Sequence, residues 1–164
     1  MRPASLAPLL APVTALKGVG PRVAALIERL AGPRVADLLW HLPSGMVDRT
    51  PAPSIAAALE GAVATLRVTV DEHRPGGHRR PYRVACSDDS GTLIVVFFHV
   101  QGDYPARALP VGMERIVSGK IESYGGVKQV THPDYILPVD RAGELPSFEP
   151  VYGLTEGLNA KALV

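Results

Sequence analysis

Residues 93–112, LIVVFFHVQGDYPARALPVG, hold an apolar run that ends in two adjacent phenylalanines and gives way to a polar loop with a tyrosine. Side chains alternate between the two faces of a β-strand. Phe97 and Phe98 therefore point to opposite faces and cannot both enter one core. Either the second ring is packed beneath another element, or it is held out for a ligand, and the pattern alone leaves both interpretations open.

A strand-like period surrounds this stretch, beginning at Gly61. Alternating apolar residues and Gly- or Asp-rich turns predict five short strands: Ala62–Val70, Tyr82–Ser87, Thr92–Phe98, Glu114–Glu122 and Val127–His132. A helical turn is expected at residues 103–109, between the third and fourth strands. This layout is typical of an OB-fold β-barrel, with other small barrels and a sandwich fragment as the alternatives.

A helical pattern precedes the strands, over residues 1–60. Four apolar residues repeat at the spacing of one buried helix face: Val23, Leu26, Ile27 and Leu30. A shorter stripe runs from Val35 to Leu42, a Pro- and Gly-rich loop follows, and a small helix is expected at Ile55–Leu59. The predicted class is therefore α+β, a helical N-terminal segment followed by a five-stranded OB-fold barrel.

Three segments follow from these patterns. Residues 1–60 form the helical segment, residues 61–135 the barrel, and residues 136–164 an extended linker. Thr155 and the residues after it resemble a cap that enters a further helix.

Composition excludes several classes of protein. Among 164 residues, 46% are hydrophobic and 20% charged, which fits a folded chain with a core and not a disordered one. The net charge of +1 gives no global basic field, and Asp and Glu outnumber Lys and Arg beyond residue 132. Cys86 is the single cysteine, so an internal disulfide is excluded, and no apolar run is long enough to span a membrane. A cytoplasmic location is the expectation.

The stretch LKGVGPR, residues 16–22, has the pattern of a helix-hairpin-helix turn. Gly18 and Gly20 allow a tight turn whose backbone N–H groups can meet a phosphate, and Lys17 adds positive charge. The alternative is a purely structural turn between two packed helices.

The stretch HRPGGHRRPYR, residues 73–83, places four arginines and two histidines between the first two strands. Guanidinium groups bind phosphates with two parallel hydrogen bonds, and this loop often lines the ligand groove of OB-folds. Arg74, Arg79 and Arg80 are therefore candidate phosphate contacts, against the alternative of a solvated hairpin tip. His73 and His78 have no third ligand nearby, so a metal site is not expected.

No catalytic set is apparent. The stretch SGKIES, residues 118–123, ends like a phosphate-binding P-loop, but Ile121 follows the lysine and Glu114 stands where the first glycine belongs. Neither a Ser/His/Asp set, nor a Cys/His dyad, nor a carboxylate pair can be assembled. The remaining candidates are the aromatic residues around Phe98, because exposed rings stack on unpaired bases of any sequence.

Several blocks in order resemble the N-terminal portion of the RecG family of bacterial ATP-dependent DNA helicases. They are LKGVGP, LWHLPSGMVDRT, LIVVFFHVQGDY, VSGKIESYGGVKQVTHPDY and PVYGLTEGLNAKAL. The resemblance implies an OB-fold wedge that grips the branch point of stalled replication forks and Holliday junctions in DNA repair and recombination. It also implies that Phe98 and Tyr104 stack on bases at the branch point. His99, in the loop between them, is a further candidate for DNA contact.

The resemblance further implies two motor lobes, which lie downstream, hydrolyse ATP with Mg²⁺ and are the wedge's own partners in a monomeric, non-membrane enzyme. No GxxxxGK[ST] motif occurs in these 164 residues, so this segment alone is not expected to hydrolyse ATP or to hold a cofactor or metal.

The chain departs from the family pattern in two places. The link between the two aromatics is longer here, because HVQGD intervenes before Tyr104, and Met46-Val47 replaces a common aromatic-acidic pair. Two other functions stay open on the residues alone: a free-standing OB-fold module that binds single-stranded nucleic acid, and a scaffold whose aromatic face docks another protein.

Overall fold

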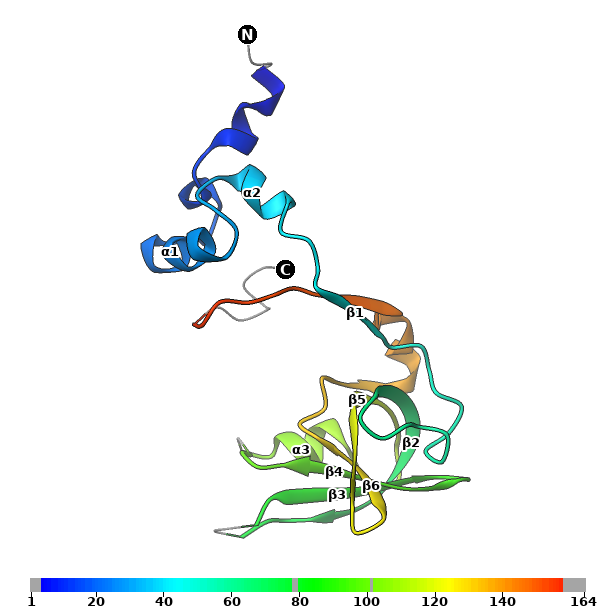
Figure 1. Ribbon diagram of the computed structural model, residues 1–164. Coiled ribbons are helices and arrows are strands. Elements are labelled where there is room, and N and C mark those ends of the chain that lie inside the picture. Colours follow the sequence, from blue (N-terminus) through cyan, green and yellow to red (C-terminus); the bar gives the residue numbers. More distant parts are fainter. Residues whose placement is uncertain (1–3, 78–79, 101, 158–164) are drawn as a thin grey trace. The chain divides into compact units, whose positions relative to one another are not determined.

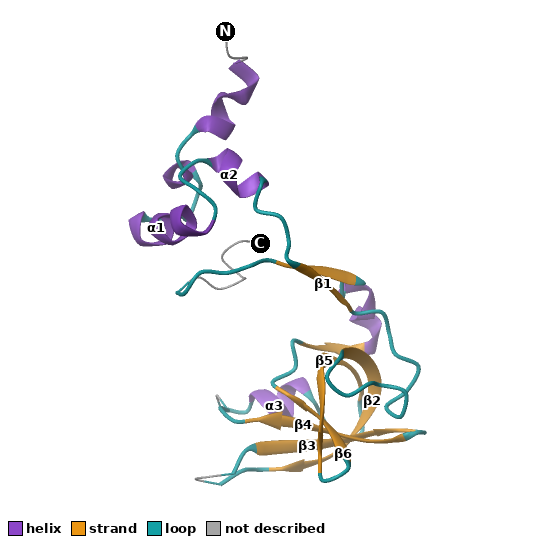
Figure 2. Ribbon diagram, viewed as in Figure 1, coloured by secondary structure: helices purple, strands orange, loops and turns teal. Residues whose placement is uncertain are grey.

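The computed structural model describes residues 4–77, 80–100 and 102–157, and the chain divides into two compact units. One unit joins residues 1–46 with residues 150–164, and the other spans Val47–Glu149 (Figure 1). The larger unit is the β-rich one, and the smaller contains the N-terminal helices (Figure 2).

The larger unit is built around a closed barrel of five strands. They are β2 (Val63–Arg74), β3 (Tyr82–Asp88), β4 (Gly91–Phe97), β5 (Glu114–Tyr124) and β6 (Val127–Thr131). The strands run in the order β2-β3-β4-β6-β5, and a β2–β5 ladder closes the ring. All neighbours are antiparallel except β4 and β6, and helix α3 (Tyr104–Ala108) connects β4 to β5. This order, with its one parallel pair and its helix, is the OB-fold layout that the sequence predicts.

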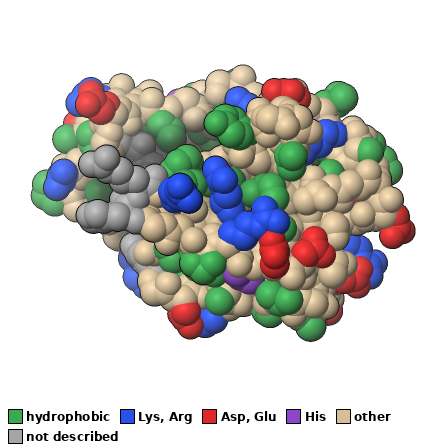
Figure 3. Space-filling view, turned by 90° about the horizontal axis from the view of Figure 1, so that it is seen from below, with side chains coloured by type: hydrophobic (Ala, Val, Ile, Leu, Met, Phe, Trp, Pro, Cys, Tyr) green, Lys and Arg blue, Asp and Glu red, His purple; other side chains and the backbone are tan. Residues whose placement is uncertain are grey.

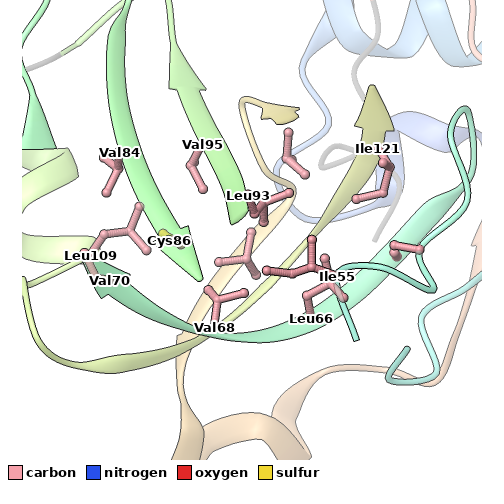
Figure 4. Packing of buried hydrophobic residues seen from close by; sticks show 14 of the residues in the cluster. Ile55, Leu66, Val68, Val70, Val84, Cys86, Leu93, Val95, Leu109 and Ile121 are labelled. Carbon is pink, nitrogen blue, oxygen red and sulfur yellow. The ribbon is translucent and has the colours of Figure 1, made fainter. Parts of the chain in front are cut away.

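The barrel core comes from the alternate residues of these strands. Leu66, Val68 and Val70 of β2 lie in one hydrophobic cluster with Val84 and Cys86 of β3, and all five are buried. Figure 4 shows these side chains converging on the barrel interior, together with those from β4 and β5. Burial raises the pKa of the Cys86 thiol to about 12, so this cysteine is an inert core residue.

Strand β2 continues beyond Val70, where the sequence predicts a turn. The pairing with β3 shifts between Val70 and Glu72, which leaves Asp71 as the extra residue of a β-bulge. An extra residue reverses the alternation of side chains, so His73 is turned toward the partly buried side and Asp71 and Glu72 are exposed. Residues 71–74 therefore belong to strand β2, and the loop of the hairpin begins only after Arg74.

The predicted helix at Ile55–Leu59 is wrong. The structure has a turn in which the Ala58 N–H donates to the Ile55 carbonyl at 3.2 Å. The Lys128 Nζ donates to the carbonyls of Ile55, Ala56 and Ala58, each at 2.7 Å. Because the ammonium takes carbonyls that a helix would use for its own ladder, the helix does not propagate.

Strands also occupy segments predicted as loop or linker. Strand β1 (Gly45–Asp48) pairs with β8 (Phe148–Val151), and β7 (Tyr135–Pro138) pairs with β5 ahead of a 3₁₀ turn, η3 (Val139–Glu144). The prediction of an extended linker from residue 136 is therefore wrong where β7, η3 and β8 form. These strands are four residues long, and a distant partner defines them, so local sequence gives no period to detect.

The smaller unit contains η1 (Ala4–Leu10), η2 (Val13–Ala15), α1 (Pro21–Leu30) and α2 (Val35–Leu39). Val13, Ala24 and Ile27 form its small buried core. The α1 prediction is confirmed, whereas α2 ends at Leu39, three residues before the predicted end. The residues after Thr155 that were expected to enter a helix lie largely outside the described part of the chain. No helix in the described ranges has the length and hydropathy needed to cross a membrane.

Candidate nucleic-acid interface

The two phenylalanines at the end of β4 have opposite environments. Phe97 is 4% exposed and belongs to the barrel core, whereas Phe98 is 60% exposed. Strand β4 ends at Phe97, so Phe98 is the first residue beyond the ladder with β3. The alternation predicted from the sequence is confirmed, and the second ring is not covered within the described structure.

His132 lies against this pair of rings. Its own N–H donates to the Val96 carbonyl at 2.9 Å, and its Nε2 accepts the Phe98 N–H at 3.1 Å. The centroid of its ring is 5.9 Å from that of Phe97, edge-on, and 6.1 Å from that of Phe98. The histidine therefore contacts the buried ring and the exposed ring at once.

Two further rings complete the group. His99 stacks on His132 with ring centroids 6.5 Å apart and planes at 22°. Tyr104, at the start of α3, is 48% exposed and meets Phe97 edge-on at 6.0 Å. We call these five residues the aromatic cluster: Phe97, Phe98, His99, Tyr104 and His132. The longer link before Tyr104 therefore still brings its ring against Phe97.

Arginines gather at the β2–β3 hairpin of the same barrel. Arg74, Arg80 and Arg83 are exposed and line a cleft of about 310 Å³ with Pro75 and Pro81. Arg74 forms an ion pair with Glu72, while Arg79 and His78 lie outside the described residues. On the face of the molecule drawn in Figure 3, several Lys and Arg side chains lie together near the centre, beside hydrophobic ones.

His73 connects this hairpin to the end of α3. Its Nε2 lies 2.7 Å from the Leu109 carbonyl, and its Nδ1 lies 2.8 Å from the Tyr82 hydroxyl. A carbonyl only accepts hydrogen bonds, so Nε2 carries a proton and donates it. Both ring nitrogens are thus engaged within the protein. Among the described residues, no group of three His, Cys, Asp or Glu could hold a metal ion.

The Lys17–Pro21 stretch forms a turn in the smaller unit. Gly18 has φ 85°, a left-handed conformation that favours glycine, and Gly20 is the N-cap residue of α1. Lys17 is exposed, so its ammonium group is accessible to an anion. These residues lie in the turn between η2 and α1, and their contact with a phosphate stays a prediction.

The stretch resembling a P-loop is a strand of the barrel. Ser118 is buried and its hydroxyl lies 2.8 Å from that of Thr65. A Cβ at Gly119 would come within 2.6 Å of Val130 Cγ1, so this glycine is required by packing between β5 and β6. Rejection of a nucleotide site here is consistent with this geometry.

Residues 12–164 match the family model described as the RecG wedge domain. This chain belongs to the RecG wedge domain family. Because the match takes in both the helical unit and the barrel, the wedge domain is more than its OB-fold.

Curated relatives of this wedge domain carry the name ATP-dependent DNA helicase RecG. The relative from Acidithiobacillus ferridurans is 32% identical over 147 residues, which cover 87% of this chain and 20% of the relative. The relative from Haemophilus influenzae is 27% identical over 161 residues, covering 93% and 22% respectively. The wedge domain thus spans about one fifth of the length of these relatives.

A solved structure described as RecG bound to a three-way DNA junction has the same fold as this wedge domain. The TM-score is 0.73 at 23% identity, and the match covers 94% of this chain and 22% of that chain. The fold of the chain is therefore that of a solved RecG structure.

Sequence reasoning missed His132 in this wedge domain. It marks His132 only as the last residue of a strand, although the side chain contacts three rings of the aromatic cluster. The sequence near His132 holds no signal for this role, because only the parallel pairing of β4 with β6 in the structure brings the histidine beside Phe98.

Proposed function

We propose that this wedge domain binds branched DNA, with the exposed rings of the aromatic cluster stacking on unpaired bases and the hairpin arginines holding phosphates. One observation carries the proposal: Phe98 is 60% exposed although it directly follows a buried strand. Tyr104, in the same aromatic cluster, is 48% exposed, and adjoining exposed apolar side chains are typical of binding surfaces.

The stacking energy is sufficient to place a base. Stacking of a base on an aromatic ring contributes about 1–3 kcal/mol and tolerates any base. Phe98 and Tyr104 both offer exposed rings, and both contact the cluster around Phe97 and His132. A base unpaired at a junction has its face free for such a ring, whereas a base within a duplex does not.

Phosphate contacts are assigned to the basic cleft. Arg74, Arg80 and Arg83 line it, and Arg79 is adjacent in sequence. Guanidinium groups hold phosphate oxygens through two hydrogen bonds, which fixes the register of the strand without reading sequence. The turn at Lys17, Gly18 and Gly20 is the candidate for a further backbone phosphate contact.

In the whole protein, this domain acts as the wedge of an ATP-dependent DNA helicase that remodels replication forks and Holliday junctions. Relatives named ATP-dependent DNA helicase RecG and a RecG structure with a three-way junction support this role. ATP and Mg²⁺ belong to motor lobes outside this chain, which pull duplex past the wedge, so strand separation at the wedge is mechanical. The enzyme is proposed to be a cytoplasmic monomer.

The partner proposed for the smaller unit is the protein's own motor. Leu39, Trp40, Leu42 and Met46 are all more than 60% exposed within eight residues of one another. Exposed apolar side chains at this density favour a protein contact over solvent. This observation also keeps protein docking as the second candidate function.

The test is a titration of the chain with a fluorescent three-way junction, a single-stranded DNA of equal length and a single-stranded RNA. Junction preference, lost on Phe98→Ala but not on Tyr124→Ala, is the expected result. Tyr124 is the matched control because its side chain is 73% exposed. It lies at the turn between β5 and β6, whereas His132 follows the opposite end of β6. A clear preference for RNA contradicts the wedge, and no binding at low salt favours protein docking.

A further inference from the structure

His132 is the residue that joins the aromatic cluster. Its ring lies 5.9 Å from Phe97, 6.1 Å from Phe98 and 6.5 Å from His99, measured between centroids. No other described residue of the cluster makes three ring contacts. His132 therefore contacts both the buried ring of Phe97 and the exposed ring of Phe98.

The backbone of His132 is shaped for this position. Its φ of 46° is left-handed, and it is the only non-glycine residue with positive φ in the described part of the chain. Its N–H extends the parallel ladder of β4 and β6 by donating to Val96. Residues held in such rare conformations cluster at binding sites, where the surrounding structure compensates the strain.

The hydrogen bond to Phe98 fixes the proton on the ring. Nε2 accepts the Phe98 N–H at 3.1 Å, so it carries no proton, and the neutral ring has its proton on Nδ1. Phe98 lies just beyond the β3–β4 ladder, where its N–H has no strand partner in that ladder. The histidine thus holds the backbone of Phe98 while its ring contacts that side chain.

We propose that His132 is a positioning residue that holds Phe98 in the orientation in which its ring stacks on an unpaired base. The inference rests on the proposed function, because Phe98 must be the stacking ring. His132 acts through two contacts, the hydrogen bond to the Phe98 backbone and the ring packing beside it. Phe98 remains 60% exposed beside His132, so much of its surface is accessible to a base.

Two substitutions separate the side chain from the backbone. His132→Gly keeps a residue that adopts positive φ readily but removes ring and acceptor. His132→Asn also tolerates positive φ and retains an acceptor oxygen, but it lacks the ring. Thermal unfolding of each variant verifies that the barrel is intact. If the glycine variant unfolds, the asparagine variant carries the test.

The experiment is a double-mutant cycle on the whole chain, with affinity for a fluorescent three-way junction as the readout. Phe98→Ala is expected to weaken binding at least about fivefold, because it removes the stacking energy of one base. His132→Gly is expected to weaken binding about threefold or more, because it removes part of that stacking energy. In the Phe98→Ala background, His132→Gly is expected to have less than about a twofold further effect. His132→Asn is expected to fall between wild type and His132→Gly.

Each alternative outcome is decisive. If His132→Gly weakens binding equally in both backgrounds, His132 acts independently of Phe98 and the inference is wrong. If Phe98→Ala weakens binding while His132→Gly does not, only the inference fails and the proposed function stands. If Phe98→Ala has no effect, the proposed function fails, and loss of protection of the Phe98 amide in His132→Gly then shows whether the structural contact alone is real.

Discussion

Arg49 and Glu149 are one hundred residues apart in the chain, and the Arg49 Nε donates to the Glu149 Oε2 at 2.6 Å. The same guanidinium donates through one Nη to Asp134 at 3.0 Å and to Ser118 at 3.1 Å, and it lies 4.9 Å from the centre of the Tyr135 ring. Arg49 itself is 5% exposed. One buried cation therefore ties the segments that enter and leave the barrel to strand β5.

Replacement of Arg49 is expected to be strongly destabilising. Burial acts to lower the pKa of Arg49, but hydrogen bonds and charges from Glu149 and Asp134 outweigh it and raise that pKa. Arg49→Ala removes all of these contacts, while the two carboxylates can partly rehydrate. We expect a loss of about 2–4 kcal/mol in the free energy of unfolding, measured in urea.

Two variants provide controls for this loss. Arg49→Lys keeps the charge but cannot span three partners, so it is expected to recover only part of the stability. Arg67→Ala breaks an exposed pair with Glu114 and should leave the urea midpoint almost unchanged. A midpoint for Arg49→Ala equal to that of Arg67→Ala would show that the buried network is not stabilising.

The lowered pKa of Asp88 is expected to make the free energy of unfolding depend on pH. Burial favours its neutral form, but hydrogen bonds from Ser90, the Ile55 N–H and the Gly91 N–H outweigh burial and lower its pKa. A lowered folded-state pKa gives stability that is present above the unfolded value near 4 and lost as pH falls through the folded value. Urea midpoints should therefore fall from pH 5 to pH 3, with a smaller fall in Asp88→Asn. Equal slopes for both proteins would exclude this carboxylate as the cause.

Gly119 is required by packing rather than by a phosphate. A Cβ there would lie 2.6 Å from Val130 Cγ1, so Gly119→Ala is expected to cost about 1–3 kcal/mol of stability. Val130→Ala removes the clashing methyl, and the double variant should therefore be more stable than the sum of the two single effects indicates. If the stability losses of the two single variants simply add in the double variant, the strain in Gly119→Ala does not come from the contact with Val130. Gly143→Ala, whose Cβ meets no atom within 4 Å and whose φ is not positive, is the control.

The sequence predicts those parts of the fold that have a local cause. Alternation locates the barrel strands and separates Phe97 from Phe98, because a strand has a fixed period of two. The bulge at Asp71 escapes prediction, since one inserted residue changes the alternation without any Gly or Pro to mark it. Strands β7 and β8 escape it because their partners are far away in the chain.

The residues of the candidate site likewise include some that local sequence predicts and one that it does not. Phe98 and Tyr104 are found from the sequence because the apolar run and the loop after it are continuous. His132 comes from a strand that follows 34 residues later, and only the parallel pairing of β4 with β6 brings its ring to Phe98. A residue whose role depends on a non-local pairing carries no mark in its own neighbourhood.

The hairpin arginines should determine the salt dependence of DNA binding. Each phosphate contact releases about one counterion, so Arg80→Ala is expected to reduce the slope of log affinity against log salt by about one. Affinity should fall for junction and single strand alike, because phosphates carry no sequence or branch information. Arg141→Ala, in an exposed pair with Glu144, is the matched control. An unchanged slope for Arg80→Ala means that the hairpin tip is only solvated.

The two phenylalanines should give opposite results when each is replaced by alanine. Phe97 is 4% exposed and fills the barrel core, so Phe97→Ala is expected to cost about 3–5 kcal/mol of stability. Phe98 is 60% exposed, so Phe98→Ala is expected to change stability by about 0.5 kcal/mol or less.

Urea unfolding and junction titration on the same samples separate these roles. Phe98→Ala should bind the junction weakly while its unfolding curve overlays that of the wild type. Phe97→Ala, under conditions where it remains folded, should lose affinity as well, because the Phe97 ring lies against both Tyr104 and His132. If Phe98→Ala unfolds like Phe97→Ala, its ring is a core residue in solution and the stacking platform does not exist.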